Sequence, residues 1–90
     1  MFEKKEKISP LQRRAVFNRI RPVIARELEI KEENITFSSH LKDLGGDSVR
    51  AIEIVMALEG EFNIEIPDEQ IDKMSTVEDI IIYLAGRVKF

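Results

Sequence analysis

Ser48 is the residue whose type and position in this sequence are best suited to chemistry. It follows Gly45, Gly46 and Asp47, at the point where a loop gives way to a segment of helical periodicity. The N-terminus of a helix presents unpaired N–H groups and a partial positive charge, so an anionic group attached to this hydroxyl is favoured. The two glycines let the chain turn tightly and keep side chains away from the hydroxyl.

The residues alone leave two interpretations of this serine. Taken as a dipeptide, Asp47-Ser48 is typical of an ordinary helix N-cap. The sequence next to Ser48 offers no general base, which argues against a serine that attacks a substrate by itself. We therefore expect a hydroxyl that another enzyme modifies, and we predict no catalytic residues in the chain.

The composition excludes several other kinds of site. The chain has 90 residues, no cysteine and one histidine, so we predict no disulfide, no metal site and no histidine-based triad. No apolar run approaches the roughly 20 residues that cross a bilayer, and the charged N-terminus lacks the apolar core of a signal peptide. We expect a cytoplasmic monomer, with a flexible charged tail over residues 1–8 and a single domain over residues 9–90.

The charge is distributed unevenly along the chain. Residues 1–31 hold nine Lys/Arg and four Asp/Glu, whereas residues 32–90 hold five Lys/Arg and thirteen Asp/Glu. The acidic part surrounds Ser48, so it favours basic partners and disfavours nucleic acid. The basic part is compatible with contact to nucleic acid or membrane, but its arginines are explained more simply as the solvated face of a helix.

A helix is predicted over residues 10–29. Ser9 is a suitable N-cap, Pro10 suits the first helical position, and Gln12 completes a capping box. Pro22 removes one backbone donor and crowds the preceding turn, so we expect the helix to bend there. The side chains predicted to face the core are Phe17, Ile20, Ile24 and Leu28.

The rest of the chain predicts a loop and three further helices. The loop covers residues 31–47, and its expected apolar anchors are Ile35, Phe37, Leu41 and Leu44. A helix over 48–62 and a short one over 68–73 follow, and Ser75 and Glu78 have the spacing of a capping box for the last helix. The inner stripe of that helix is Val77, Ile80, Ile81, Leu84 and Val88. We therefore predict an all-α fold, a small four-helix bundle with three main helices and a short third one.

The helix over 48–62 carries two apolar arcs. At about 100° per residue, the first arc is formed by Ala51, Ile54, Val55, Leu58 and Phe62, and we expect it to face the core. The second arc is formed by Val49, Ile52 and Met56, beside Glu53. It is either more core or an exposed docking surface, because an apolar patch rimmed by carboxylates next to a modifiable serine suits transient partners.

From about Arg19 to Leu84 the chain resembles the acyl carrier protein family. The matching segments are Asp43-Leu44-Gly45, Asp47-Ser48, and residues 53–59, 61–62, 65–69 and 75–77. The resemblance implies that Ser48 carries 4′-phosphopantetheine, which a phosphopantetheinyl transferase adds from coenzyme A with Mg²⁺. It implies that Asp47 takes part in recognition by the transferase, and that the thiol of the arm holds an acyl group as a thioester.

The resemblance also implies how such a carrier meets its partners. The carrier is not itself an enzyme, and acyl-loading and acyl-processing enzymes dock on it through basic patches. The residues implied in docking, together with Asp47, are Val49, Ile52, Glu53, Met56 and Glu59. Our first hypothesis is a stand-alone acyl carrier protein of fatty-acid, lipid or related biosynthesis.

Departures from the family pattern keep two alternatives open. The Gly-Gly pair before Asp47 and the Val-Arg-Ala-Ile run after Ser48 are more similar to aminoacyl or peptidyl carriers of nonribosomal synthesis. Arg50 replaces an acidic or small polar residue, and His40 stands where a large apolar residue usually lines the acyl pocket. We expect His40 to be solvated or hydrogen-bonded to backbone, with Leu41 as the core anchor instead. The remaining alternative is an unmodified helical adaptor, in which loss of the serine hydroxyl has no effect.

Overall fold

The computed structural model describes residues 9–87, which form four α-helices and two short 3-10 helices. The main helices are α1 (Pro10–Leu28), α2 (Ser48–Phe62) and α4 (Val77–Ala85), and α3 (Asp68–Ile71) is a single turn. The all-α fold with three main helices and a short third one is therefore confirmed. The predicted tail over 1–8 and the predicted core position Val88 lie outside the described residues.

Helix α1 begins as its sequence predicts. The Ser9 side chain accepts a hydrogen bond from the backbone N–H of Gln12, and the Gln12 side chain accepts one from the backbone N–H of Ser9. The helix is continuous through Pro22 and ends at Leu28, where Glu29 adopts a left-handed conformation with φ 58°. The missing donor at Pro22 is tolerated because the residues around it bury a full apolar stripe against the core. The bend at Pro22 stays a prediction.

The long loop after α1 is held at several points. Ile35 and Leu41 are buried and Leu44 is half-buried. Phe37 remains partly exposed, but its ring stacks on that of Phe17 with 4.4 Å between centroids. The loop contains two 3-10 helices, η1 (Glu32–Asn34) and η2 (Lys42–Leu44). All four predicted anchors thus contact the body of the domain, as a loop of this length requires.

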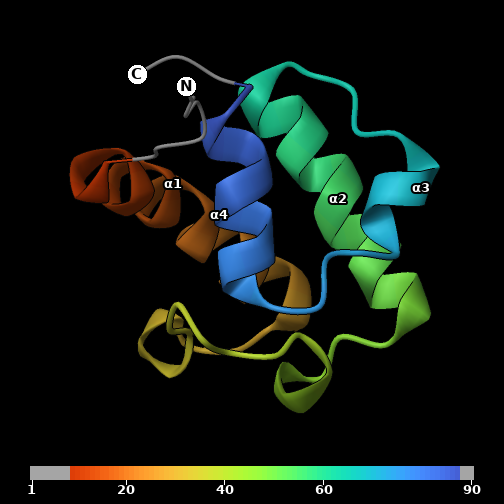
Figure 1. Cartoon of the computed structure of the whole chain (residues 1–90). Coiled ribbons are helices and arrows are strands. Elements are labelled where there is room, and N and C mark those ends of the chain that lie inside the picture. Colours follow the sequence, from red (N-terminus) through yellow and green to blue (C-terminus); the bar gives the residue numbers. More distant parts are fainter. Residues whose placement is uncertain (1–8, 88–90) are drawn as a thin grey trace.

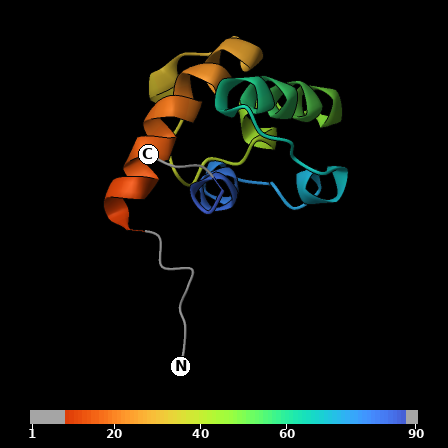
Figure 2. The same cartoon turned by 90° about the horizontal axis from the view of Figure 1, so that it is seen from above.

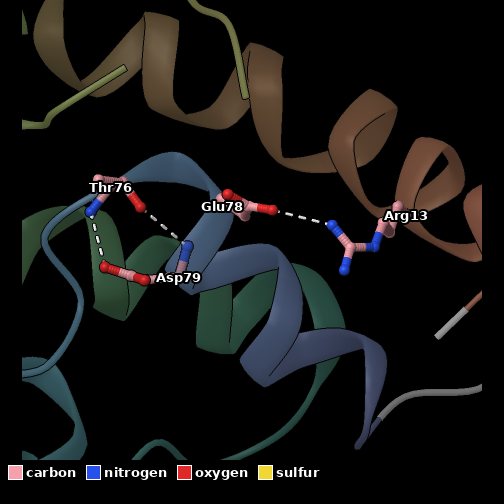
Figure 3. Close-up of polar contacts among 4 residues, drawn as sticks. All are labelled: Arg13, Thr76, Glu78 and Asp79. Carbon is pink, nitrogen blue, oxygen red and sulfur yellow. Dashed lines mark hydrogen bonds and ion pairs between the residues drawn. The ribbon is translucent and has the colours of Figure 1, made fainter. Parts of the chain in front are cut away.

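The start of α4 corrects one sequence prediction. The capping box is formed by Thr76 and Asp79, and not by Ser75 and Glu78. The Thr76 hydroxyl accepts from the Asp79 N–H at 3.1 Å, and the Asp79 carboxylate accepts from the Thr76 N–H at 3.0 Å (Figure 3). A Ser75 cap would need the backbone N–H of Glu78, which donates instead to the carbonyl of Phe37 at 3.0 Å. Glu78 then faces α1 and forms an ion pair with Arg13 at 2.9 Å (Figure 3).

Three helices enclose the core. Helix α1 contacts both α2 and α4, and α3 lies beside α2 on the side of the molecule away from α1 (Figures 1 and 2). The fully buried side chains are Val16, Ile20, Ile24, Ile35, Ile54, Leu58, Val77, Ile80, Ile81 and Leu84. The predicted stripe of α1 and the described part of that of α4 are buried as expected, and they position α2 with its N-terminus at the end of the long loop.

Candidate functional site

The loop before Ser48 needs glycine at two positions for two different reasons. Gly45 has φ 96°, in the left-handed region that residues with a Cβ rarely adopt. Gly46 is buried, and its N–H donates to the carbonyl of Leu41 at 2.7 Å. A Cβ at Gly46 would lie 2.9 Å from that same carbonyl oxygen. The loop is thus packed tightly on its own backbone, a contact that sequence reasoning missed.

Substitution by alanine is expected to change stability in opposite directions at Gly46 and Gly60. Gly46→Ala is expected to lower the free energy of unfolding by about 1–3 kcal/mol, since the new methyl group forces the loop away from Leu41. Gly60→Ala is the matched control, because Gly60 lies inside α2 with no atom near its would-be Cβ. It is expected to raise stability by ~0.5–1 kcal/mol. Urea unfolding of both variants measures the two signs, and a Gly46→Ala variant as stable as wild type would contradict this account of the loop.

Asp47 is the N-cap of α2, which leaves Ser48 as its first helical residue. The Asp47 carboxylate accepts a hydrogen bond from the backbone N–H of Arg50 at 2.9 Å. Ser48 is exposed, and within residues 9–87 its hydroxyl has no hydrogen-bond partner. The interpretation of the pair as an N-cap therefore applies to Asp47 alone. The serine hydroxyl is not used in capping and is open to an approaching enzyme.

A groove of about 990 Å³ begins at Ser48. One wall is formed by residues 40–42 of the loop, and the other by α3 with Met74 and Ser75. The first turns of α2 complete it through Asp47, Ala51 and Ile52. A flexible group attached to the Ser48 hydroxyl would therefore have a groove of the same molecule beside it.

The second apolar arc of α2 is exposed. The exposed fractions are 64% for Val49, 49% for Ile52 and 63% for Met56, and Glu53 is also exposed. We call Val49, Ile52 and Met56, with Glu53 at the edge, the α2 patch. In the first arc, by contrast, Ile54, Val55 and Leu58 are buried, and Ala51 and Phe62 are half-buried. The alternative that both arcs belong to the core is wrong, whereas a docking role stays a prediction.

Glu59 differs from the other predicted docking residues. It is half-buried, and its carboxylate accepts a hydrogen bond from the backbone N–H of Ile66 at 2.7 Å. Ile66 is itself buried in the segment between α2 and α3. Glu59 thus fixes the chain that leads into one wall of the groove, a role that sequence reasoning did not anticipate.

Removal of this carboxylate is expected to loosen the segment before α3. Glu59→Ala should lower the free energy of unfolding by about 1 kcal/mol, because it leaves the N–H of buried Ile66 without its partner. Glu59→Gln retains an acceptor oxygen and should lose less. Glu53→Ala serves as the control, since this exposed side chain has no partner within residues 9–87. Guanidinium unfolding curves compare the three, and equal midpoints for all of them would refute the assignment to Glu59.

Arg50 and His40 both have a structural explanation. The Arg50 guanidinium donates to the carbonyl of Glu27 in the last turn of α1 at 3.0 Å, so it joins two helix ends. His40 is exposed and lines the groove, while Leu41 takes the core position, as expected. The backbone at His40 forms an isolated antiparallel bridge with Thr76.

Residues 9–87 offer neither a metal site nor a membrane-spanning helix. In this part of the chain no group of three or more histidine, cysteine, aspartate and glutamate side chains is placed to hold a metal ion. None of the helices described here has the length and apolar character needed to cross a membrane.

Comparison with known protein families identifies the family to which this chain belongs. A model of the family described as "Phosphopantetheine attachment site" matches residues 18–84, about three quarters of the chain. The chain belongs to this family of carrier proteins. The match covers the long loop, the N-terminus of α2 and the groove beside it.

As a phosphopantetheine carrier, the protein bears a 4′-phosphopantetheine group and is not catalytic. When attached, the group supplies a thiol, which the chain lacks because it has no cysteine. The structure fits such a group, because an exposed hydroxyl with no partner in the described part of the chain lies at a helix N-terminus beside a groove. The partners of a phosphopantetheine carrier are the transferase that modifies it and the enzymes that use its cargo.

Proposed function

We propose that Ser48 is the attachment residue and that the protein carries acyl intermediates as thioesters. The observation that supports this most strongly is the exposed hydroxyl of Ser48 at the first position of α2, which has no hydrogen-bond partner among residues 9–87. The Asp47 cap uses the N–H of Arg50, and the N–H groups of Ser48 and Val49, which have no partner within residues 9–87, remain for an attached phosphodiester. The acyl groups belong to fatty-acid, lipid or related biosynthesis. The carrier contributes presentation, and the chemistry takes place in partner enzymes.

The α2 patch is the proposed docking surface for these partners. Its apolar side chains all follow Ser48 on the same helix, the last of them at Met56, and exposed Asp47 and Glu53 carry negative charge beside them. A small apolar contact with acidic steering suits a partner that binds quickly, presents a basic patch and leaves again. Glu59 is assigned to the segment before α3, so it contributes charge near the patch and little free surface.

Reversal of one charge tests this surface. Glu53→Lys is expected to lower kcat/KM for the modifying transferase by ~2- to 5-fold, comparable with the roughly 0.2–1 kcal/mol of an exposed ion pair. Glu33→Lys is the control, because it makes the same charge change on exposed η1, outside the α2 patch. The difference between the variants should shrink at high salt. Equal rates for both variants at low salt would contradict docking at this position.

The experiment on the proposed function has two stages. Incubation with coenzyme A, Mg²⁺ and a broad-specificity transferase should add one phosphopantetheinyl group, measured by intact mass. The modified protein is then offered to a panel of acyl and aminoacyl ligases. Loading by acyl ligases supports the proposal. Exclusive aminoacylation would instead favour the aminoacyl or peptidyl carrier that the Gly46-Asp47-Ser48-Val49-Arg50 run suggests.

A further inference from the structure

Gly60 is a glycine inside α2 that the fold itself does not require. Its φ lies outside the left-handed region that Gly45 adopts, and a Cβ at this position would meet no atom within 4 Å, unlike one at Gly46. The helix ends at Phe62, and the residue that adopts the left-handed conformation there is Asn63, with φ 57°. Glycine is a poor helix former, so at this position it lowers the stability of α2 without a compensating contact in the described part of the chain.

Gly60 continues the exposed strip of α2 that begins next to Ser48. At about 100° per residue, a side chain at position 60 would project within roughly 40° of Val49 and Met56. Gly60 is itself exposed, and it lies about 6 Å beyond Met56 along the helix axis. The strip therefore runs from Val49 through Met56 to Gly60, and in its last turn the helix backbone carries no side chain.

The two carboxylates next to Gly60 in the sequence are bound elsewhere. The Glu59 carboxylate accepts a hydrogen bond from the backbone N–H of Ile66 at 2.7 Å, in the segment before α3. The Glu61 carboxylate forms an ion pair with Arg19 of α1 at 3.1 Å. Neither side chain, nor any other described residue, places an atom within 4 Å of a Cβ built at Gly60. The end of the strip thus leaves room for a side chain of another protein.

The modifying transferase is a partner that can reach this space. A specific interface covers about 800 Å² of each protein, a patch roughly 30 Å across. Gly60 lies about 18 Å from Ser48 along the helix, so one such interface includes both. Exposed Glu53 lies between them and attracts a basic enzyme surface. An apolar side chain that packs beside Met56 can approach the helix backbone most closely where the next turn carries a glycine.

We propose that Gly60 is a specificity-determining residue, which lets the phosphopantetheinyl transferase pack a bulky apolar side chain directly on the backbone of α2 beside Met56. The inference rests on the proposed function, because it places the transferase on the α2 patch with Ser48 as its target. The docking surface then extends from Val49 to Gly60. The stability that glycine takes from the free helix is offset by this close contact in the complex.

Steady-state kinetics of phosphopantetheinyl transfer test this contact. A broad-specificity transferase receives coenzyme A, Mg²⁺ and increasing concentrations of the apo carrier. Gly60→Gln is expected to raise the KM for the carrier by about 5-fold or more at unchanged kcat, because its side chain fills the space needed for docking and leaves Ser48 untouched. Gly60→Ala should raise the KM by ~2-fold. Both variants should melt at or above the Tm of wild type, since glutamine and alanine are better helix formers than glycine.

Gly86→Gln is the matched control. Gly86 is also exposed, its φ of −84° suits any residue, and it lies at the end of α4, outside the α2 patch. Its KM should equal that of wild type. A KM for Gly60→Gln within about twofold of wild type would overturn the inference, as would an equal rise for Gly86→Gln. Failure of wild type to acquire any arm counts against the proposed function, whereas equal transfer to wild type and both Gly60 variants counts only against the contact at Gly60.

Discussion

Ser48→Ala is expected to abolish phosphopantetheinylation completely while leaving the fold intact. The hydroxyl oxygen is the proposed attachment atom, so its removal leaves no acceptor at the N-terminus of α2. Stability should change by less than ~0.5 kcal/mol, because the side chain is exposed and Asp47 supplies the cap. Intact mass after treatment with transferase and coenzyme A measures the first effect, and thermal unfolding measures the second.

Ser38→Ala is the matched control for this experiment. Ser38 is also an exposed serine in the long loop, but it lies outside the groove and the α2 patch. This variant should gain one phosphopantetheinyl group, as wild type does. A gain of mass by Ser48→Ala would move the attachment to another hydroxyl. If Ser48→Ala lost the modification but supported every partner reaction, the unmodified adaptor would become the better hypothesis.

Leu58→Ala is expected to have the largest effect on stability among the substitutions considered. Leu58 is fully buried in the first arc of α2, so its truncation removes apolar contacts and leaves a cavity. The free energy of unfolding should fall by about 2–5 kcal/mol, a large part of the roughly 5–15 kcal/mol that holds a domain folded. The shift of the urea midpoint at constant slope measures it.

Met56→Ala is the comparison on the same helix. Met56 belongs to the α2 patch and is 63% exposed, so its loss should change stability by less than ~0.5 kcal/mol. The same variant should weaken partner docking, because it removes part of the proposed contact. Similar destabilisation by both variants would mean that the two arcs of α2 do not differ as the structure describes.

Local patterns predicted much of the fold. The capping box at Ser9 and the spacing of Phe17, Ile20 and Ile24 located α1 within one residue of its end. Helical periodicity also divided the apolar residues of α2 into two arcs, and the first is buried or half-buried as predicted, whereas only the structure shows that the second is exposed. These predictions succeeded because capping and periodicity involve residues within about four positions of each other, a distance that the sequence displays directly.

Contacts between distant segments were not predictable in the same way. The bond from Glu59 to Ile66 and the bond from Arg50 to the carbonyl of Glu27 depend on how helices are placed in space. The shift of the capping box from Ser75 to Thr76 also depends on tertiary structure, because the Glu78 N–H that a Ser75 cap would need donates to the carbonyl of Phe37 in the long loop. Two overlapping pairs in the sequence had suitable spacing, and the hydrogen bond to the long loop is compatible with only one of them.

The loop before Ser48 was predicted only in part from the sequence. The sequence correctly placed a glycine turn before the helix, and Gly45 indeed has a positive φ. The need for Gly46 comes instead from its approach to the backbone of Leu41, five positions earlier. Because no side-chain pattern encodes a backbone contact of this kind, only the folded loop reveals why the second glycine is there.

The prosthetic group should be attached to Ser48, and the mass of one tryptic peptide tests this claim. Trypsin cleaves after Lys42 and Arg50, and it releases residues 43–50 with Ser48 as their only hydroxyl-bearing side chain. After treatment with transferase and coenzyme A, mass spectrometry should find one phosphopantetheinyl group on this peptide, with fragment ions that place it on the serine. An unmodified 43–50 peptide, with the added mass on any other peptide, would contradict the claim.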